Sequence, residues 1–162
     1  MAEGAYDRLI TLLDSHDASY RIIDHGPEGR TEIVSPMRGN ALAAAVKCMV
    51  VMVKLSKKQR AHVLAVVPGD RRVDLEAIKT LKNGRYAGFA DAETAEALSG
   101  CALGTVLPFS WNTQLELVVD PDIYSHQEIF FNAGLLDRSL ALASADHRRI
   151  ARAHEAHVSQ SG

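Results

Sequence analysis

The hydrophobic positions along the chain switch between helical and strand spacing, a pattern typical of an α/β domain. The opening segment repeats apolar residues at i, i+3, i+4 and i+7, the spacing of one face of an amphipathic helix. These residues are Tyr6, Leu9, Ile10 and Leu13. Residues 48–53 are instead continuously apolar and rich in β-branched side chains, which predicts a central strand buried on both faces.

Turn-forming residues divide the rest of the chain into further helices and strands. The expected helices are residues 32–46 (in two pieces broken by Pro36 and Gly39, the second capped by Asn40), 74–82, 91–98 and 144–157. The expected strands are residues 20–23, 62–67, 86–89, 115–119, 129–132 and 139–143. Because no repeat or linker interrupts this order, we expect one α/β domain over residues 1–157, with a mixed β-sheet surrounded by helices. Residues 158–162 are expected to form a disordered tail.

Composition narrows the class of protein without identifying it. The chain has 162 residues, 47% of them hydrophobic, and a formal net charge of −2. A protein of this charge has no global basic surface, so any nucleic acid would have to be bound by a local patch. Neither a signal peptide nor an apolar stretch of about 20 residues is visible, and Cys48 and Cys101 lack disulfide or metal spacing. We therefore expect a cytoplasmic protein with buried free thiols and no contact with membranes.

Lys47 is the only charge between residues 41 and 53. An ammonium group in an apolar run loses hydration worth several kcal/mol unless a polar or negative group compensates. It either reaches solvent at the end of a strand or serves a ligand, by holding a phosphate, polarising a carbonyl or acting as a base or nucleophile. The residue pattern alone leaves both interpretations open.

A second candidate is the uncharged segment 99–109, which Gly100, Gly104 and Pro108 punctuate. Glycine lets a ligand approach the backbone, so N–H groups here could donate to a carbonyl oxygen or a developing oxyanion. The alternative is an ordinary helix end followed by a strand.

The remaining polar residues are less specific. A basic cluster after the central strand consists of Lys54, Lys57, Lys58 and Arg60. It suits phosphate contacts with a polynucleotide, and equally a solvated surface. His154 and His157 would share a helical face, but no third ligand is spaced to join them, so we expect no metal site.

Four motifs occur in an order that points to a known family. Lys47 stands in AVKCMVVMVK, Gly104 begins the Gly-x-x-x-Pro loop GTVLP, Asp120 ends the strand LVVDP, and Asn132 and Gly134 lie in FNAG. In order and spacing these motifs resemble those of the YbaK/ProX aminoacyl-tRNA deacylase family. That family comprises free-standing relatives of the editing domain of bacterial prolyl-tRNA synthetase.

The resemblance covers residues 6–153, nearly the whole chain. The phrases EIVSPMRG, GCALGTVLPFS and FNAGLLDRS are similar to the YeaK-like branch, whose members are expected to remove serine or threonine from tRNA. The resemblance thus implies proofreading in trans by hydrolysis of the ester bond of mischarged aminoacyl-tRNA, without a cofactor. Alternative substrates are Ala-, Cys- and Pro-tRNA.

The implied chemistry assigns catalytic roles to Lys47 and Gly104. The ester is already activated towards water, so hydrolysis needs a placed water and oxyanion stabilisation rather than a covalent nucleophile. Gly104 N–H would face the ester carbonyl, and Lys47 would hold the terminal phosphate, the ribose or the carbonyl. The vicinal ribose hydroxyl would help to activate the water.

Residue type, loop location and the resemblance supply the candidates for substrate binding. They are His25, Thr31, Ser35, Thr105, Pro108, Asp120, Asn132 and Gly134. The expected partner is the acceptor end of an aminoacyl-tRNA, gripped by the basic cluster. Docking to a synthetase or an elongation factor, and the oligomeric state, stay open.

Two rival functions come from other classes. The same groove could bind a tRNA end or an aminoacyl metabolite without catalysis, or the chain could be an interaction-only α/β protein with Lys47 exposed.

Overall fold

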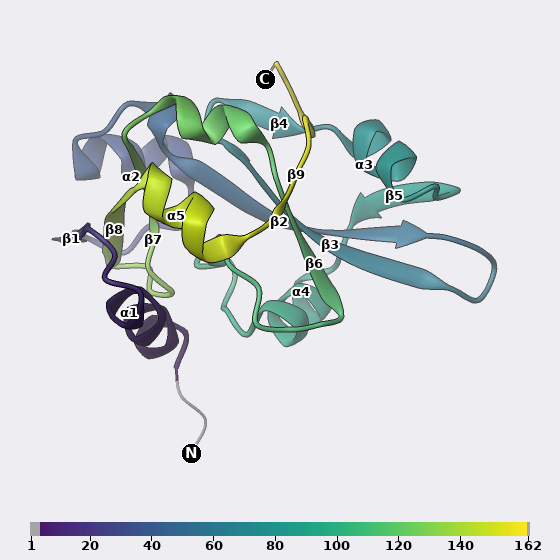
Figure 1. The fold of residues 1–162 in the computed structure, drawn as a ribbon, viewed down its shortest axis with the longest axis horizontal. Coiled ribbons are helices and arrows are strands. Elements are labelled where there is room, and N and C mark those ends of the chain that lie inside the picture. The colour runs from purple at the N-terminus through teal and green to yellow at the C-terminus, as the bar shows by residue number, and fades with distance from the viewer. Residues whose placement is uncertain (1–3, 162) are drawn as a thin grey trace.

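Strands form the centre of the molecule, and helices cover its edges (Figure 1). The computed structural model describes residues 4–161. Its helices are α1 (Ala5–Ser15), α2 (Thr31–Arg38), α3 (Leu75–Leu81), α4 (Ala92–Ser99) and α5 (Ser144–Ala151), with 3₁₀ helices at Leu42–Ala44 and Pro121–Ser125. Its strands are β1 (Tyr20–Asp24), β2 (Val46–Lys54), β3 (Arg60–Pro68), β4 (Arg71–Val73), β5 (Tyr86–Phe89), β6 (Leu115–Val119), β7 (Glu128–Asn132), β8 (Arg138–Ala143), β9 (His154–Glu155) and β10 (Ser159–Ser161).

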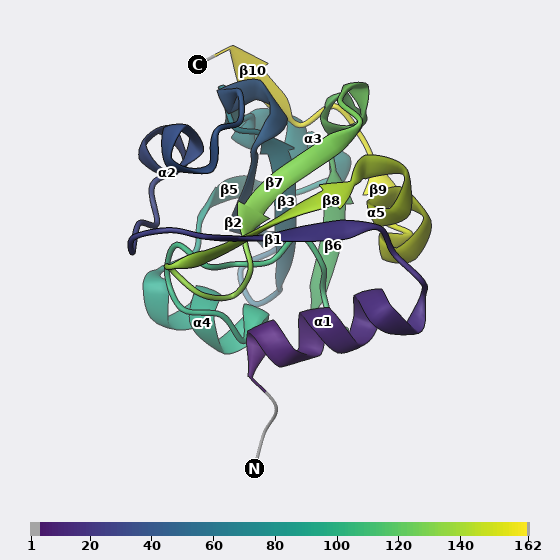
Figure 2. The same cartoon turned by 90° about the vertical axis from the view of Figure 1, so that its left-hand side faces the viewer.

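The largest sheet is mixed and has the strand order β5-β2-β3-β6-β9. Strand β2 pairs antiparallel with β3 and β5, whereas β3–β6 and β6–β9 are parallel pairs. The α/β class and the mixed sheet are therefore confirmed. The expected single sheet is subdivided, because β1, β8 and β7 form a separate antiparallel sheet that lies across the larger one (Figure 2).

Two hydrophobic cores cover the two faces of the five-stranded sheet. Alternate residues of its strands face the β1-β8-β7 sheet and α1, where Leu9, Leu64 and Leu140 are fully buried. The intervening residues face α3 and the C-terminal segment, around Val63 and Ile78. This period-two alternation explains why β3 reads as a continuous apolar run.

The C-terminal segment differs from the prediction. Helix α5 ends at Ala151, where Arg152 adopts a left-handed conformation with φ 47°, and the chain then forms β9 and β10. The helix expected to reach residue 157 is therefore wrong in length. The expected disordered tail is wrong for residues 159–161, because these form β10 and pair with β4; residue 162 of that tail lies outside the described residues. Val158, just before β10, is 1% exposed and belongs to the second core.

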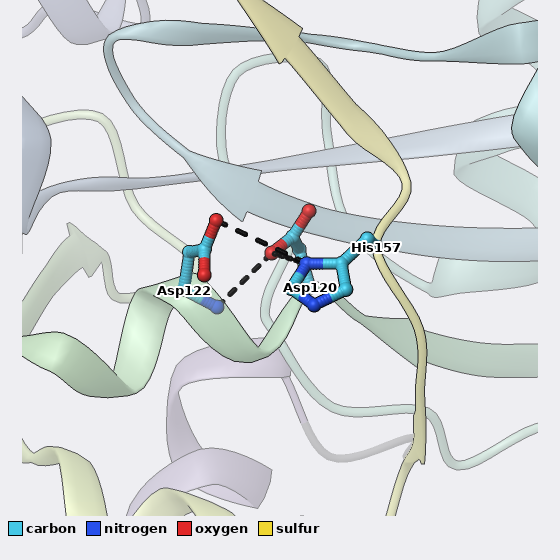
Figure 3. Close-up of side chains that lie close together, drawn as sticks. All are labelled: Asp120, Asp122 and His157. Atoms are coloured by element: carbon cyan, nitrogen blue, oxygen red, sulfur yellow. Dashed lines mark hydrogen bonds and ion pairs between the residues drawn. The ribbon is translucent and has the colours of Figure 1, made fainter.

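Asp120 ties this segment to the body of the protein (Figure 3). Its fully buried carboxylate accepts hydrogen bonds from Asp122 N at 3.0 Å, Val158 N at 3.1 Å and Ser159 Oγ at 2.7 Å. Charge-assisted bonds of this kind are stronger than neutral ones. Asp120 therefore binds the chain's own C-terminal strand, at the end of β6.

The segment after α2 also differs from the prediction. Helix α2 continues past Pro36 to Arg38 and ends at Gly39, whose φ of 76° favours glycine. Only a 3₁₀ turn follows, and Asn40 does not cap it: its side chain bonds Arg38, Ser35 and the carbonyl of Ala41.

His147 of α5 is a buried polar residue of the first core. One ring nitrogen, Nε2, lies 2.7 Å from the carbonyl of Pro108, and Nδ1 lies 2.8 Å from the hydroxyl of Tyr124. Burial lowers the pKa of His147 to about 4. The neutral ring, donating through Nε2 and accepting at Nδ1, satisfies both contacts.

We predict that His147 makes the protein less stable in acid. The folded state keeps the ring neutral down to about pH 4, whereas the unfolded chain takes up a proton below about pH 6.5. The contribution of His147 to the free energy of unfolding is thus fully present above pH 6.5. About 3 kcal/mol of it is lost as the pH falls towards 4. Urea titrations at pH 7 and 4.5 should show a smaller pH-dependent loss in His147→Gln than in the parent chain. His16→Gln, at an exposed position, should keep the parent's dependence; equal dependence in all three proteins contradicts the prediction.

Candidate active site

A cavity of about 480 Å³ lies between α2, the edge of β2, β7 and the loop that follows α4. Helices α2 and α4, which contribute Val34 and Ala95 to its lining, lie on the left of Figure 2. Its lining consists of Gly29, Arg30, Thr31, Val34, Arg38, Val46, Lys47, Cys48, Met49, Val50, Ala95, Leu103, Gly104, Val106, Phe131, Asn132 and Leu136. Four residues predicted from the sequence are therefore brought together: Thr31, Lys47, Gly104 and Asn132.

The cavity exists because β5 is shorter than β2. Strand β5 pairs only with residues 51–54, so the edge of residues 46–50 has no strand beside it. Val50 directs its carbonyl to this edge, where it accepts from Ala90 N at 3.0 Å. Since backbone groups alternate along a strand, Cys48 presents its N–H and C=O to the same side. An open strand edge is a template for hydrogen bonding to a ligand.

Lys47 is half-buried at this edge, and its ammonium is held by a neutral group. Nζ donates to the carbonyl of Arg71, 3.1 Å away. Within residues 4–161 no carboxylate lies within ion-pair distance of Nζ. The interaction-only alternative, with Lys47 exposed, therefore loses its support, and the positive charge is available to a ligand.

Gly104 lies where only glycine fits. Its φ is 82°, and a Cβ there would stand 2.9 Å from the Cα of Gly29. Both features exclude a side chain. No acceptor for the Gly104 N–H is found in the described part of the chain, so this amide can donate to a ligand in the cavity.

Asn132 holds the Gly104 loop in place. Its Nδ2 donates to the carbonyls of Gly104, at 3.0 Å, and Glu28, at 2.8 Å. Its Oδ1 accepts from the hydroxyl of Ser139 at 2.9 Å. One amide thus joins two loops that pack against each other in the cavity wall, which makes Asn132 a positioning residue.

His25 and Ser35 lie one layer behind the cavity wall rather than in it. His25 Nε2 is 2.6 Å from Ser139 Oγ, and its Nδ1 is 2.8 Å from the carbonyl of Gly26. Ser35 is 1% exposed, and its hydroxyl accepts from Arg38 and Asn40. Both therefore support the polar residues of the wall.

Four other predicted site residues serve structural contacts away from the cavity. Thr105 is buried and donates to the carbonyl of Ala102. The carbonyl of Pro108 contacts His147, Asp120 binds the C-terminal segment, and Gly134 packs against α1 with a φ of 80°. Motifs that follow one another along the chain can therefore have structural roles outside the cavity.

The basic cluster Lys54, Lys57, Lys58 and Arg60 lies at the β2–β3 hairpin. Seven residues separate Lys54 from Lys47 along β2, and at about 3.4 Å per residue the two are about 24 Å apart. The cluster therefore cannot contact a group bound at Lys47, although it could contact a long ligand further along.

Arg38 is the cavity residue that the sequence analysis missed. It is 8% exposed, and burial lowers its pKa to about 10. Thr31, Val34 and Arg38 recur at i, i+3 and i+7 on α2, and all three line the cavity. A charge on the apolar face of a short helix is the signal that could have identified it.

Among the residues that the structure describes, none that lines the cavity is an activated serine or cysteine nucleophile. The cavity's one thiol belongs to Cys48, and burial raises the pKa of that thiol far above its usual range. Burial likewise raises the pKa of Cys101. Both thiols therefore stay protonated near neutral pH, which suits hydrolysis by water rather than covalent catalysis.

A separate group of possible metal ligands consists of Asp120, Asp122 and His157 (Figure 3). One atom from each lies within 4.8 Å of the others. The hydrogen bonds of Asp120 to the C-terminal segment account for this arrangement, together with an ion pair between Asp122 and Arg71 at 3.2 Å. It does not line the cavity.

No helix of the described chain is long and apolar enough to cross a bilayer.

Comparison with known proteins indicates an enzymatic function for this chain. A model of the aminoacyl-tRNA editing domain matches residues 30–150. The multifunctional Ser/Thr-tRNA deacylase ProXp-y of Escherichia coli K12 is 39% identical over 154 residues, which cover 93% of this chain and 92% of the relative.

Solved structures show the same fold. A crystal structure described as a candidate trans-editing enzyme for prolyl-tRNA synthetase superposes with a TM-score of 0.78 at 20% identity, covering 99% of this chain and 100% of the other. A hypothetical protein superposes with a TM-score of 0.83 at 20% identity, over 94% and 99% of the two chains. Residues 30–150 include α2, β2, β7 and the Gly104 loop, which build the cavity. The chain belongs to the aminoacyl-tRNA editing domain family.

Proposed function

We propose that this protein hydrolyses the ester bond of mischarged Ser-tRNA or Thr-tRNA in trans. The observation that carries the proposal is the meeting of Lys47 and the Gly104 amide in one cavity, at an open strand edge. The 39% identity to a Ser/Thr-tRNA deacylase supports the choice of amino acids. A protein with this activity would meet its substrate in the cytoplasm, where charged tRNA is used.

In the proposed reaction a water molecule attacks the ester carbonyl carbon. The carbonyl oxygen becomes an oxyanion, to which the N–H of Gly104 donates and which the charge of Lys47 stabilises. The C–O bond to the terminal ribose then breaks, and the ribose oxygen leaves with a proton that derives from the water. The vicinal ribose hydroxyl assists this proton transfer, since no histidine or carboxylate among residues 4–161 lines the cavity to act as a base.

A polar residue of the cavity wall suggests which amino acid side chain the substrate carries. Thr31 lines the cavity, and its hydroxyl has no partner in the described chain. A site that hydrogen-bonds a substrate hydroxyl rejects an analogue without one far more strongly than an apolar pocket rejects a missing methylene. We therefore assign Thr31 to recognition of the serine or threonine hydroxyl.

The hairpin cluster would contact the acceptor arm beyond the terminal nucleotide. Its four cations lie too far from Lys47 to reach the bound ester, but a nucleic acid duplex spans that separation easily. Phosphate contacts there would add affinity without reading sequence.

Lys47→Ala should lower kcat/KM for deacylation of Ser-tRNA about 100-fold or more, the usual cost of removing one group that stabilises an oxyanion. Release of serine from charged tRNA measures the effect, and a melting curve confirms folding. Lys79→Ala is the matched control, because Lys79 pairs with Glu76 on α3 and lies outside both the cavity and the hairpin cluster; it should retain kcat/KM. A folded Lys47→Ala protein with full activity contradicts the assignment.

The substrate series tests the choice of amino acid. Deacylation of Ser-tRNA and Thr-tRNA should exceed that of Ala-tRNA and Pro-tRNA by at least about 10-fold in kcat/KM, because the latter pair lacks the hydroxyl. Thr31→Val should reduce this preference while keeping the volume of the side chain. A preference for Ala- or Pro-tRNA refutes a hydroxyl-reading pocket, and failure to release any amino acid favours the non-catalytic binding module.

Asn132→Asp should lower kcat about 10-fold, since a carboxylate cannot donate to the carbonyls of Gly104 and Glu28 and would leave the loop unheld. Asn112→Asp is the matched control. Asn112 also donates a side-chain amide hydrogen bond to a backbone carbonyl, that of Leu98 in the last turn of α4, but outside the cavity. Equal effects of the two substitutions on kcat would show that Asn132 contributes stability alone.

A further inference from the structure

The charged residues that line the cavity in the described chain are all positive. Three cations line it, and no aspartate or glutamate does so among residues 4–161. Arg30 is neutralised by Glu28 at 3.0 Å, and this contact holds the pKa of Glu28 at about 2. Arg38 and Lys47 have no such partner, so the cavity keeps two uncompensated positive charges in a protein whose net charge is −2.

Arg38 is the more deeply buried of the two cations. Its Nε donates to Asn40 Oδ1 at 2.9 Å, Nη1 to Ser139 Oγ at 3.2 Å and Nη2 to Ser35 Oγ at 3.3 Å. All three acceptors are neutral. A guanidinium has five N–H donors, so one hydrogen on each terminal nitrogen has no acceptor in the described chain.

A purely structural role accounts for only part of this arrangement. Arg38 is the last residue of α2, where a cation interacts favourably with the helix dipole, and its bonds fix the turn to Asn40. An arginine that served only to stabilise the helix end could do so with its guanidinium exposed to water. Burial of the charge against neutral groups costs several kcal/mol unless an anion compensates.

We propose that Arg38 binds a phosphate group of the ligand, namely the phosphate on the 5′ side of the terminal adenosine of tRNA. Arginine suits this ligand because its N–H groups match phosphate oxygens in geometry and charge. In the uncleaved ester the phosphates are the only anionic groups, so they are the compensation that the substrate can bring. This inference rests on the proposed function, and it assigns Arg38 to binding rather than to the chemical step.

Two minimal substrates isolate the contact: 3′-O-seryl-adenosine and its 5′-monophosphate. They differ only in the phosphate, so the ratio of their kcat/KM values measures its contribution. We expect the 5′-monophosphate to be better by about 10- to 100-fold in the parent protein, as for a charge-assisted hydrogen bond. Arg38→Gln should bring the ratio close to one, and Arg38→Lys should restore part of it.

Arg21→Gln is the matched control, because Arg21 pairs with Glu128 on the exposed face of β1 and does not line the cavity. It should keep the parent's ratio. Since the ratio compares two substrates on one protein, a partial loss of folded protein in Arg38→Gln does not alter it. A ratio near one in the parent protein, or a parent-like ratio in Arg38→Gln, overturns the proposal.

Failure of the proposed function gives a different result. In that case neither minimal substrate nor Ser-tRNA is hydrolysed, yet titration calorimetry would still find adenosine 5′-monophosphate binding more tightly than adenosine, with the difference abolished in Arg38→Gln. Such binding would assign the phosphate site to a free nucleotide. Binding of free serine that depends on Arg38, with no preference for the nucleotide, would show that the arginine binds a carboxylate and would overturn the phosphate assignment.

Discussion

The early end of the β2–β5 pairing is the constraint on which the site depends. Four residues of β5 cover the far half of β2 and leave residues 46–50 with an open edge. If β5 continued, its backbone would occupy the place of the cavity. Loops and α2 border the opening instead, and the unpaired backbone of Cys48 faces it. An exposed edge usually favours aggregation, but here residues of α2 and of the loops line the cavity beside it.

The polar network around Asn132 gives this opening a defined shape. One amide holds the Gly104 loop and the Glu28 loop together, and Ser139 orients that amide. The same hydroxyl accepts from Arg38 and lies against His25. Loops are the most mobile parts of most proteins, so a catalytic backbone amide on a loop needs such fixation to stay within a few tenths of an ångström of its target.

Local patterns in the sequence predicted most of the helices and strands up to β8, but not β4 or the 3₁₀ turn before β2. They also singled out Lys47 and Gly104, which both line the cavity. A charge within an apolar run and a glycine in an uncharged loop are local signals that need no partner to be seen. The C-terminal strands were missed because residues 144–157 have helical composition, while β10 forms only by pairing with β4, far away in the chain. Asp120 was assigned to substrate binding for the same reason. The groups that donate to its carboxylate, Val158 N–H and the Ser159 hydroxyl, are far away in the chain.

Arg38 illustrates what a pattern cannot show. A helical wheel places it on the apolar face of α2, but the wheel does not show which groups surround the guanidinium in three dimensions. Its neighbours Ser35, Asn40 and Ser139 are polar enough to hold a guanidinium but supply no negative charge. Replacing an isolated buried charge by an apolar residue often stabilises a protein, so stability alone does not favour an arginine here. A ligand that carries the missing charge does, and the acceptor end of a tRNA carries one phosphate for every nucleotide.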